Sequence, residues 1–331
     1  MTQQHWAQNQ EKTNHWGIVF LLTIHRYLGR LPFRIFMGPV ILFYWLMDKN
    51  VRVHSMDYLQ RAQSYGLFKQ KPTLMLSLRH LAFFGETILD KFLALTDPDD
   101  KATLAIENDQ MIMDCIARKQ GAIVLTSHMG CIEKLINHGL QQKETELVIL
   151  MHTKHARQFN ALLRDRNQAL KKIHFMEVSA LSPASACEIE TYVARGALVF
   201  IAGDRIPIAS DATCEVSFLG HKARFPIGGT ILANLFHCPL FSITCWRTPK
   251  KMPVLSGQTH HYTVRFGNLS NGKNVYINRH QRREDISILV EGFVKELEAG
   301  LAKSPLDWAN FYAFWPQTSE NLKSDAKDKT C

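Results

Sequence analysis

The sequence predicts an α/β fold in which a central, mostly parallel sheet is flanked by helices, with an N-terminal helical segment that associates with a membrane. Short runs of branched apolar residues, typical of buried strands, alternate with stretches whose apolar residues recur at helical spacing. Such alternation is typical of strand–helix–strand units with parallel strands. No linker rich in Pro, Gly or Ser divides the 331 residues. One main domain is therefore expected.

The N-terminal segment is expected to lie on a membrane. After a polar stretch at residues 1–15, apolar runs at 16–24 and 31–47 are interrupted by basic residues and prolines. Crossing a bilayer takes about 20 apolar residues, and an arginine at mid-membrane is costly. We therefore predict membrane-associating helices over 16–50 that lie in the interface. The alternatives are a tilted single span, with Arg34 reaching the headgroups, and an ordinary buried helix pair.

The main α/β domain is expected over residues 51–316. Strand-like runs lie at residues 73–78, 103–106, 122–126, 147–151, 172–178, 197–202 and 262–266. Helical patterns lie near residues 81–95, 110–119, 132–140, 155–171, 184–195 and 284–301. The tail at 317–331 is polar and has no hydrophobic period, so we predict that it is disordered.

His128 and Glu133 form an H-x-x-x-x-E pattern where the strand at 122–126 meets a helix. On one continuous helix the two side chains would diverge by about 140°, so the spacing predicts His128 in the turn and Glu133 in the first helical turn, reaching back. Neutral imidazole is a suitable general base near pH 7, and a carboxylate bonded to its other nitrogen fixes the tautomer. The pair indicates acyl transfer to a hydroxyl. The alternative is an ordinary acid at a helix start.

Four blocks of the chain resemble one protein family. They are residues 127–133, a strand that ends in Asp at 198–205, an F-x-G-x-x-A-x-x-P-x-G block at 218–228 that leads into a helix and a strand ending at Arg247, and an aromatic ending at 305–315. Together they resemble the lysophospholipid acyltransferase superfamily, in its late lipid A (lauroyl/myristoyl) acyltransferase-like branch. The ending is similar to a sub-branch of predicted acyltransferases, some linked to aryl polyene or other glycolipid pathways.

The resemblance runs from about residue 16 to 315 and implies a glycerol-phosphate acyltransferase-like fold. It implies His128 as catalytic base and Glu133 as its catalytic partner. The residues implied to bind substrate are Met129, Gly130, Arg164, Asp204, Arg205, Phe218, Gly220 and Pro226. Arg164 suits a phosphate or carboxylate, although a surface helix arginine is the alternative. Ile132 and Arg205 depart from the family, which often has an aromatic residue and Gln at these positions.

The resemblance also implies the partners. The acyl donor would be an acyl-carrier-protein or coenzyme A thioester, with no metal and no further cofactor, and the acceptor a hydroxyl of a lipid or glycolipid. Backbone N–H groups around residues 129–131 would bind the oxyanion. A net charge of +9 favours an anionic membrane surface or an acidic carrier protein. No nucleic-acid partner is expected, because no zinc-finger or RNP-like pattern accompanies the charge. The expected location is the cytoplasmic face of a bacterial inner membrane.

Other reactive residues are interpreted as structural. Seven cysteines without a C-x-x-C motif argue against disulfides and a zinc site, and favour the cytoplasm. Cys131 lies near the proposed base, but nothing nearby is expected to lower its pKa. The pair His152 and His155 is interpreted as surface or packing residues rather than a metal pair. His80 and Glu86 repeat the main pair at the wrong spacing, and residues 81–84 between them are interpreted as packing or a lipid-facing wall.

Two other functions stay open. One is a thioesterase or lysolipid hydrolase that uses Ser127 or water as nucleophile, although the chain has no G-x-S-x-G motif. The other is a lipid-binding protein without catalytic activity.

Overall fold

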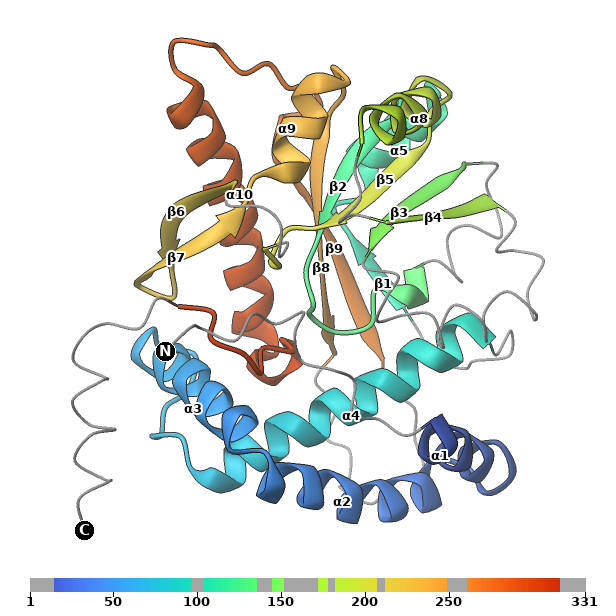
Figure 1. The fold of residues 1–331 in the computed structure, drawn as a ribbon, viewed down its shortest axis with the longest axis vertical. Coiled ribbons are helices and arrows are strands. Elements are labelled where there is room, and N and C mark those ends of the chain that lie inside the picture. Colours follow the sequence, from blue (N-terminus) through green and yellow to red (C-terminus); the bar gives the residue numbers. More distant parts are fainter. Residues whose placement is uncertain are drawn as a thin grey trace.

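A seven-stranded sheet forms the centre of the computed structural model, in the order β1-β9-β8-β2-β5-β3-β4 (Figure 1). The structure describes residues 15–96, 104–135, 145–151, 172–177, 182–206, 212–248 and 261–315. Neighbouring strands run parallel except β8 and β9, which are antiparallel. The predicted α/β fold with a mostly parallel sheet is confirmed.

The strands of this sheet follow the apolar runs of the sequence. They are β1 (Leu104–Glu107), β2 (Ala122–Thr126), β3 (Leu147–Met151), β4 (Ile173–Glu177), β5 (Leu198–Ala202), β8 (Leu240–Arg247) and β9 (Tyr262–Asn268). Every residue of β8 is buried, as expected for a central strand covered on both faces. A separate antiparallel hairpin, not predicted from the sequence, joins β6 (Thr213–Phe218) to β7 (His221–Pro226). Its turn is made by Leu219 and Gly220, both with positive φ.

Helices cover both faces of the sheet and one of its ends. They are α1 (His15–Leu28), α2 (Arg30–Met47), α3 (Lys49–Ser64), α4 (Leu74–Thr96), α5 (Gln110–Ala117), α8 (Pro183–Ala194), α9 (Gly228–Leu235) and α10 (Arg282–Lys303), followed by a 3₁₀ turn, η4 (Pro305–Asp307). One core lies between the sheet and α8, α9 and α10, and a second on the face that α5 covers. The helices α1 to α4 lie together at one end of the molecule (Figure 1).

The predicted strand at residues 73–78 is wrong, because residues 74–78 form the first turns of α4 and residue 73 precedes it. A run of leucines and a methionine resembles a buried strand, but Leu74 and Met75 are exposed while Ser77 is fully buried. The Thr73 hydroxyl accepts a hydrogen bond from the Leu76 N–H at 3.2 Å, which is a helix-start contact.

Several predictions fall outside the described residues. These are the helix at 155–171, the residues Arg164, His152 and His155, residues 1–14 of the polar stretch predicted at 1–15, and the tail at 317–331. Of the helix predicted at 132–140, the structure describes residues 132–135, of which 133–135 are helical.

Candidate active site

Two neighbouring parallel strands bring His128 and Asp204 together. Strands β2 and β5 are paired in register, with Thr126 opposite Ala202. The Gly203 N–H donates to the Thr126 carbonyl at 2.8 Å and continues the pairing beyond the strands. His128 and Asp204 each lie two residues past a strand end, so both motifs share the carboxyl edge of the sheet, as the sequence predicted. Ligands of parallel α/β sheets bind at this edge.

The Asp204 carboxylate holds His128 at two points. Its Oδ1 lies 2.8 Å from His128 Nδ1, and its Oδ2 accepts the main-chain N–H of His128 at 2.8 Å. Asp204 is 1% exposed, whereas 44% of the His128 side chain is exposed. Among the described residues, no hydrogen bond engages Nε2 of the ring. The imidazole is thus anchored through Nδ1 and offers Nε2 to an incoming group.

The charges around the pair fix its protonation states. Burial opposes ionisation of Asp204, but the His128 imidazole, the Arg205 guanidinium and two hydrogen bonds hold the pKa of Asp204 well below its usual range. Desolvation by the surrounding protein and the charge of Arg205 lower the pKa of His128 below 6.5, against the opposing attraction of Asp204. At pH 7 the ring is therefore neutral. Its Nδ1–H donates to an ionised carboxylate, and the Nε2 lone pair is available as a base.

The predicted contact between Glu133 and His128 is wrong. Glu133 Oε1 instead accepts a hydrogen bond from Lys91 Nζ of α4 at 2.9 Å. Gly130 has a φ of 62° and passes so close to β8 that an added Cβ would lie 2.4 Å from the Cys245 carbonyl oxygen. This turn directs the following residues towards α4, so the Glu133 carboxylate meets an ammonium group rather than the imidazole. Asp204, predicted only to bind substrate, is the carboxylate that contacts His128.

Backbone groups after His128 are largely occupied. The Gly130 N–H donates to the Asp307 carbonyl at 3.0 Å, so it is not free to bind an oxyanion as predicted. The Met129 side chain is 1% exposed and packs beside Gly300 of α10 instead of facing a substrate.

Arg205 is also occupied by protein groups. Its guanidinium donates to the Tyr312 hydroxyl at 3.0 Å and to the Ala309 carbonyl at 2.6 Å, and it lies over the Tyr312 ring. Nη1 is 3.5 Å from Oδ2 of Asp204. Arg205 therefore acts on His128 through its charge and fixes the segment after residue 308, and these contacts leave its substrate-binding role unsupported.

The residues predicted from the 218–228 block belong to the hairpin. Phe218 is fully buried and stacks on Trp315 at 5.5 Å, with its ring also 5.3 Å from Trp308. Gly220 lies in the hairpin turn, where an added Cβ would be 3.9 Å from Tyr65, and Pro226 ends β7. Phe218 thus packs against the Trp308 ring in the core rather than lining a substrate site.

Two alternative nucleophiles are poorly placed. Cys131 is fully buried, and this burial raises the pKa of its thiol well above the usual value. Ser127 is 7% exposed, and its hydroxyl oxygen is buried without a partner among the described residues. Within the described part of the chain, no cluster of three His, Cys, Asp or Glu residues suits a metal ion.

No protein-family model and no curated protein matches the chain. Among solved structures, the chain is similar to the 1-acyl-sn-glycerophosphate (LPA) acyltransferase PlsC from Thermotoga maritima, with 13% sequence identity and a TM-score of 0.32. That similarity covers 80% of this chain and 98% of the other. A similarity this low does not establish a shared activity, so function has to be argued from the site.

His80, which the sequence analysis set aside because its spacing to Glu86 is wrong for a second pair, is buried in the same region. Its Nε2 lies 2.8 Å from the Trp308 carbonyl oxygen and its Nδ1 lies 3.0 Å from the Ser55 hydroxyl. Burial lowers the pKa of His80 to about 4, so the ring is neutral at pH 7. Because a carbonyl only accepts, Nε2 carries the proton and Nδ1 accepts from Ser55. No spacing in the sequence links His80 to a residue more than 200 positions later.

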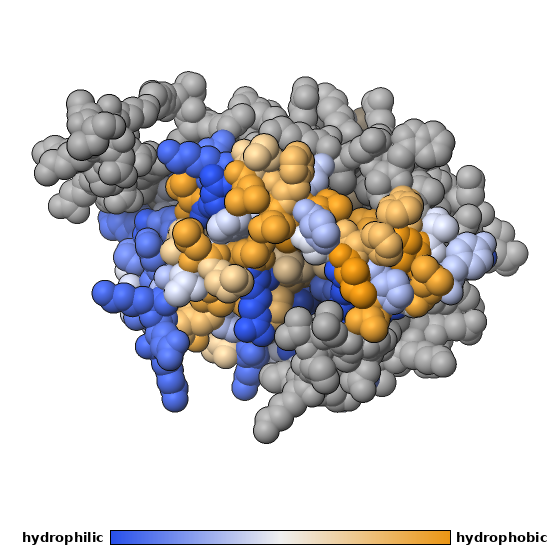
Figure 2. Space-filling model, turned by 90° about the horizontal axis from the view of Figure 1, so that it is seen from below, coloured by the Kyte–Doolittle hydropathy of each residue, from blue (hydrophilic) through white to orange (hydrophobic). Residues whose placement is uncertain are grey.

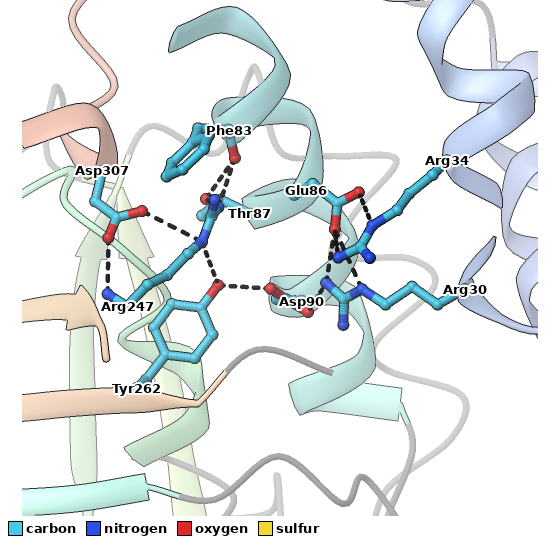
Figure 3. Close-up of polar contacts among 9 residues, drawn as sticks. All are labelled: Arg30, Arg34, Phe83, Glu86, Thr87, Asp90, Arg247, Tyr262 and Asp307. Atoms are coloured by element: carbon cyan, nitrogen blue, oxygen red, sulfur yellow. Dashed lines mark hydrogen bonds and ion pairs between the residues drawn. The ribbon is translucent and has the colours of Figure 1, made fainter. Parts of the chain in front are cut away.

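A buried polar network connects α2 to η4, the turn that follows α10 (Figure 3). Arg30 of α2 contacts Asp90 at 2.6 Å and Glu86 at 3.0 Å, both on α4. From Asp90 the contacts continue through the Tyr262 hydroxyl at 2.5 Å to Arg247 of β8.

Arg247 then holds Asp307, since its main-chain N–H donates to Oδ2 at 2.7 Å and its Nε lies 3.3 Å from Oδ1. Arg34 adds a second guanidinium to Glu86 at 2.9 Å. Three arginines therefore balance three carboxylates in this network, which ends one residue before Trp308.

Proposed function

We propose that this chain is an O-acyltransferase. It moves a fatty acyl group from an acyl-carrier-protein or coenzyme A thioester to a hydroxyl of a lipid or glycolipid. The observation that carries the proposal is the His128–Asp204 pair, with Nδ1 bonded to a buried carboxylate and Nε2 unoccupied by the described residues at the carboxyl edge of the sheet. That arrangement suits a base that accepts a proton from an attacking hydroxyl.

The reaction is a direct transfer. The acceptor hydroxyl gives its proton to Nε2 of His128 while its oxygen forms a bond to the thioester carbonyl carbon. The resulting imidazolium is stabilised by the Asp204 carboxylate, which keeps the ring in place through Nδ1. When the tetrahedral intermediate collapses, the C–S bond breaks and the leaving thiolate takes the proton back from Nε2. No acyl-enzyme is needed, which agrees with the buried positions of Ser127 and Cys131.

The N-terminal helices support a lipid acceptor. Figure 2 shows apolar side chains gathered on the underside of the molecule, the side that α1 to α4 occupy in Figure 1. The exposed apolar side chains of these helices include Phe20, Tyr27, Leu28, Ile35, Phe36, Val40, Leu42, Phe43, Leu46, Met47, Leu74 and Met75. A patch of this kind on a soluble surface marks a contact with a protein or a membrane.

We propose that α2 lies in the membrane interface. By length and composition it is the one helix among the described residues that is able to cross a bilayer, and only 17% of it is buried. Yet Arg30 and Arg34 are paired with Glu86 of α4, which fixes α2 along α4 rather than releasing it as a span. With a net charge of +9, attachment to an anionic leaflet follows, and the cytoplasmic face of a bacterial inner membrane fits that chemistry.

The test is acyl transfer by the purified full-length protein. Labelled acyl-carrier-protein and acyl-coenzyme A are each offered with a bacterial lipid extract, and products are identified by mass spectrometry. His128→Ala is expected to lower turnover by roughly 100- to 10,000-fold, the usual contribution of a general base. His280→Ala, a change at an exposed histidine before α10, is the matched control and is expected to keep normal turnover.

Three outcomes contradict the proposal. Near-normal turnover of His128→Ala would mean that His128 is not the general base. Release of free fatty acid without an acylated lipid identifies a hydrolase that uses water. Unchanged label in every extract identifies a protein that binds lipid without acting on it.

A further inference from the structure

The segment at 305–315, here called the C-terminal strap, is paired with the loop that carries His128. The Ala309 N–H donates to the His128 carbonyl at 2.9 Å, and the Gly130 N–H donates to the Asp307 carbonyl at 3.0 Å. These two bonds form an antiparallel bridge between Met129 and Trp308. The strap, although far later in the sequence, is therefore bonded to the backbone on both sides of Met129.

Trp308 also reaches the carboxylate of the site. Its indole Nε1 donates to Oδ2 of Asp204 at 2.9 Å, and the whole side chain is buried. Oδ2 accepts the His128 main-chain N–H as well, so Oδ1 is left to face the imidazole. Because an indole nitrogen only donates, this contact favours the ionised form of Asp204.

The strap is itself held from several directions. His80 binds the Trp308 carbonyl at 2.8 Å, and the Tyr58 hydroxyl donates to the Pro305 carbonyl at 2.5 Å. Arg247 binds the Asp307 carboxylate (Figure 3). Rings of Phe218, Phe314 and Trp315 surround the indole at centroid distances of 5.1 to 6.0 Å. With its backbone and ring both fixed, Trp308 has little freedom to move its N–H away from Asp204.

We infer that Trp308 is a positioning residue for the transfer reaction, whose indole N–H fixes Asp204 so that Oδ1 meets Nδ1 of His128. The inference rests on the proposed function and adds the C-terminal strap to the active site. Trp308 does not touch the reacting atoms in this scheme. It acts through Asp204, which in turn contacts the base His128.

The test compares Trp308→Phe with Trp315→Phe. Both tryptophans are buried in the same aromatic cluster, but the indole nitrogen of Trp315 has no partner among the described residues. Each variant loses one indole N–H and a similar volume, and only Trp308→Phe loses a bond to Asp204. We expect Trp308→Phe to lower kcat roughly 10- to 100-fold with KM within about two-fold, as for loss of a hydrogen bond to a charged group. Trp315→Phe is expected to keep kcat.

A second measurement does not depend on activity. The pKa of the His128 ring is followed by NMR in ¹⁵N-histidine-labelled protein, and its signal is assigned by its loss in His128→Gln. In Trp308→Phe the carboxylate keeps the His128 N–H and Arg205 but loses one donor. Without the indole bond, Oδ1 is no longer fixed against Nδ1, so the attraction by which Asp204 raises the His128 pKa weakens. The His128 pKa is therefore expected to fall, against the constant influence of Arg205 and Lys91. Trp315→Phe is expected to leave it unchanged.

The two readouts separate the inference from the proposed function. A lowered His128 pKa in Trp308→Phe alone supports positioning, even where the wild-type protein transfers no acyl group and the proposed function fails. An unchanged or raised His128 pKa, or equal shifts in both variants, overturns the inference. If wild-type protein transfers acyl groups and both Phe variants have equal kcat, positioning fails and the proposed function stands.

Discussion

At the scale of single residues, the decisive contact is the one between His128 and Asp204. A histidine that is 44% exposed would ordinarily rotate freely, and both ring nitrogens would meet water. The Asp204 carboxylate removes that freedom by accepting from Nδ1 and from the main chain of the same residue. The result is one tautomer with a defined direction for the free lone pair, which is what proton transfer in a transition state requires.

The first residue-scale prediction concerns the pH dependence of kcat/KM. The pKa of His128 lies below 6.5, so the neutral base persists at mildly acidic pH, and activity is lost only as pH falls through that lowered pKa. Asp204 raises the pKa of the ring, and Asp204→Asn removes that attraction. We expect the acid limb of the profile to move further towards acid in Asp204→Asn. Turnover at pH 7 is expected to fall roughly 1,000-fold or more, because the tautomer is no longer fixed.

Glu133→Gln is the comparison for this experiment, because it makes the same chemical change in the carboxylate first predicted to partner His128. Its partner is Lys91, so we expect the acid limb to stay in place and turnover to change far less than in Asp204→Asn. A wild-type acid limb above pH 6.5, or a larger effect from Glu133→Gln than from Asp204→Asn, would contradict this assignment.

The sequence predicted the residues of the site that follow paired strands, but not the contacts made by a tight turn or by residues far apart in the chain. The shared position of His128 and Asp204 was predictable, because carboxyl ends of parallel strands meet at one edge of a sheet. The partner of Glu133 was not, because a spacing of five residues does not reveal the left-handed Gly130 turn that redirects the chain. Trp308 lies 104 residues from Asp204 in the chain, and no local pattern marks that contact.

At the scale of elements, the buried network fixes α2 and α4 to the sheet. Asp90 is its midpoint, since it contacts Arg30 of α2 on one side and Tyr262 of β9 on the other (Figure 3). Breaking a buried ion pair by removing one charge costs about 3 to 5 kcal/mol, because the other charge is left without compensation in the interior. The network therefore makes the α2–α4 contact sensitive to single substitutions.

We predict that Asp90→Asn lowers the free energy of unfolding by about 3 kcal/mol, measured by urea denaturation. The matched control is Asp57→Asn in α3, where the carboxylate pairs with Arg61 at 2.9 Å but is 33% exposed. A solvent-exposed i,i+4 pair contributes less than about 1 kcal/mol, so the control is expected to change stability little. Equal losses in the two variants would mean that the network adds no stability beyond that of a surface pair.

Helices and strands were predicted correctly where the apolar residues of a segment followed one clear pattern, either helical or strand-like. β2 and β3 match the sequence prediction residue for residue, because their branched apolar runs are bounded on both sides. The start of α4 was read as a strand because its apolar residues are consecutive, and only the tertiary position shows that Leu74 and Met75 face outwards. The β6–β7 hairpin was missed because its turn, Leu219-Gly220, lacks the Asn-Gly or Asp-Gly pair that marks a tight turn in sequence.

At the scale of the whole molecule, the candidate site and the apolar underside lie at the same end. α4 carries His80, which binds Trp308 beside the site, and also Leu74 and Met75, which are exposed with the apolar residues of α2. The helices therefore stand between the carboxyl edge of the sheet and the surface that we assign to lipid (Figures 1 and 2).

The last prediction is that this underside binds membranes. Phe43→Ser with Met47→Ser removes two α2 side chains that are 59% and 68% exposed. Burial of each is worth roughly 1.5 to 3 kcal/mol, so flotation with vesicles that contain anionic phospholipid is expected to fall at least about ten-fold. Tyr276→Ser with Ile288→Ser is the control, because these exposed side chains precede and begin α10, at the end away from α2 in Figure 1. Equal flotation of both double variants would mean that the lipid contact lies elsewhere on the molecule. In 1 M salt the Debye length is about 3 Å, so loss of all binding there would mean that only charge attracts the protein to the vesicles.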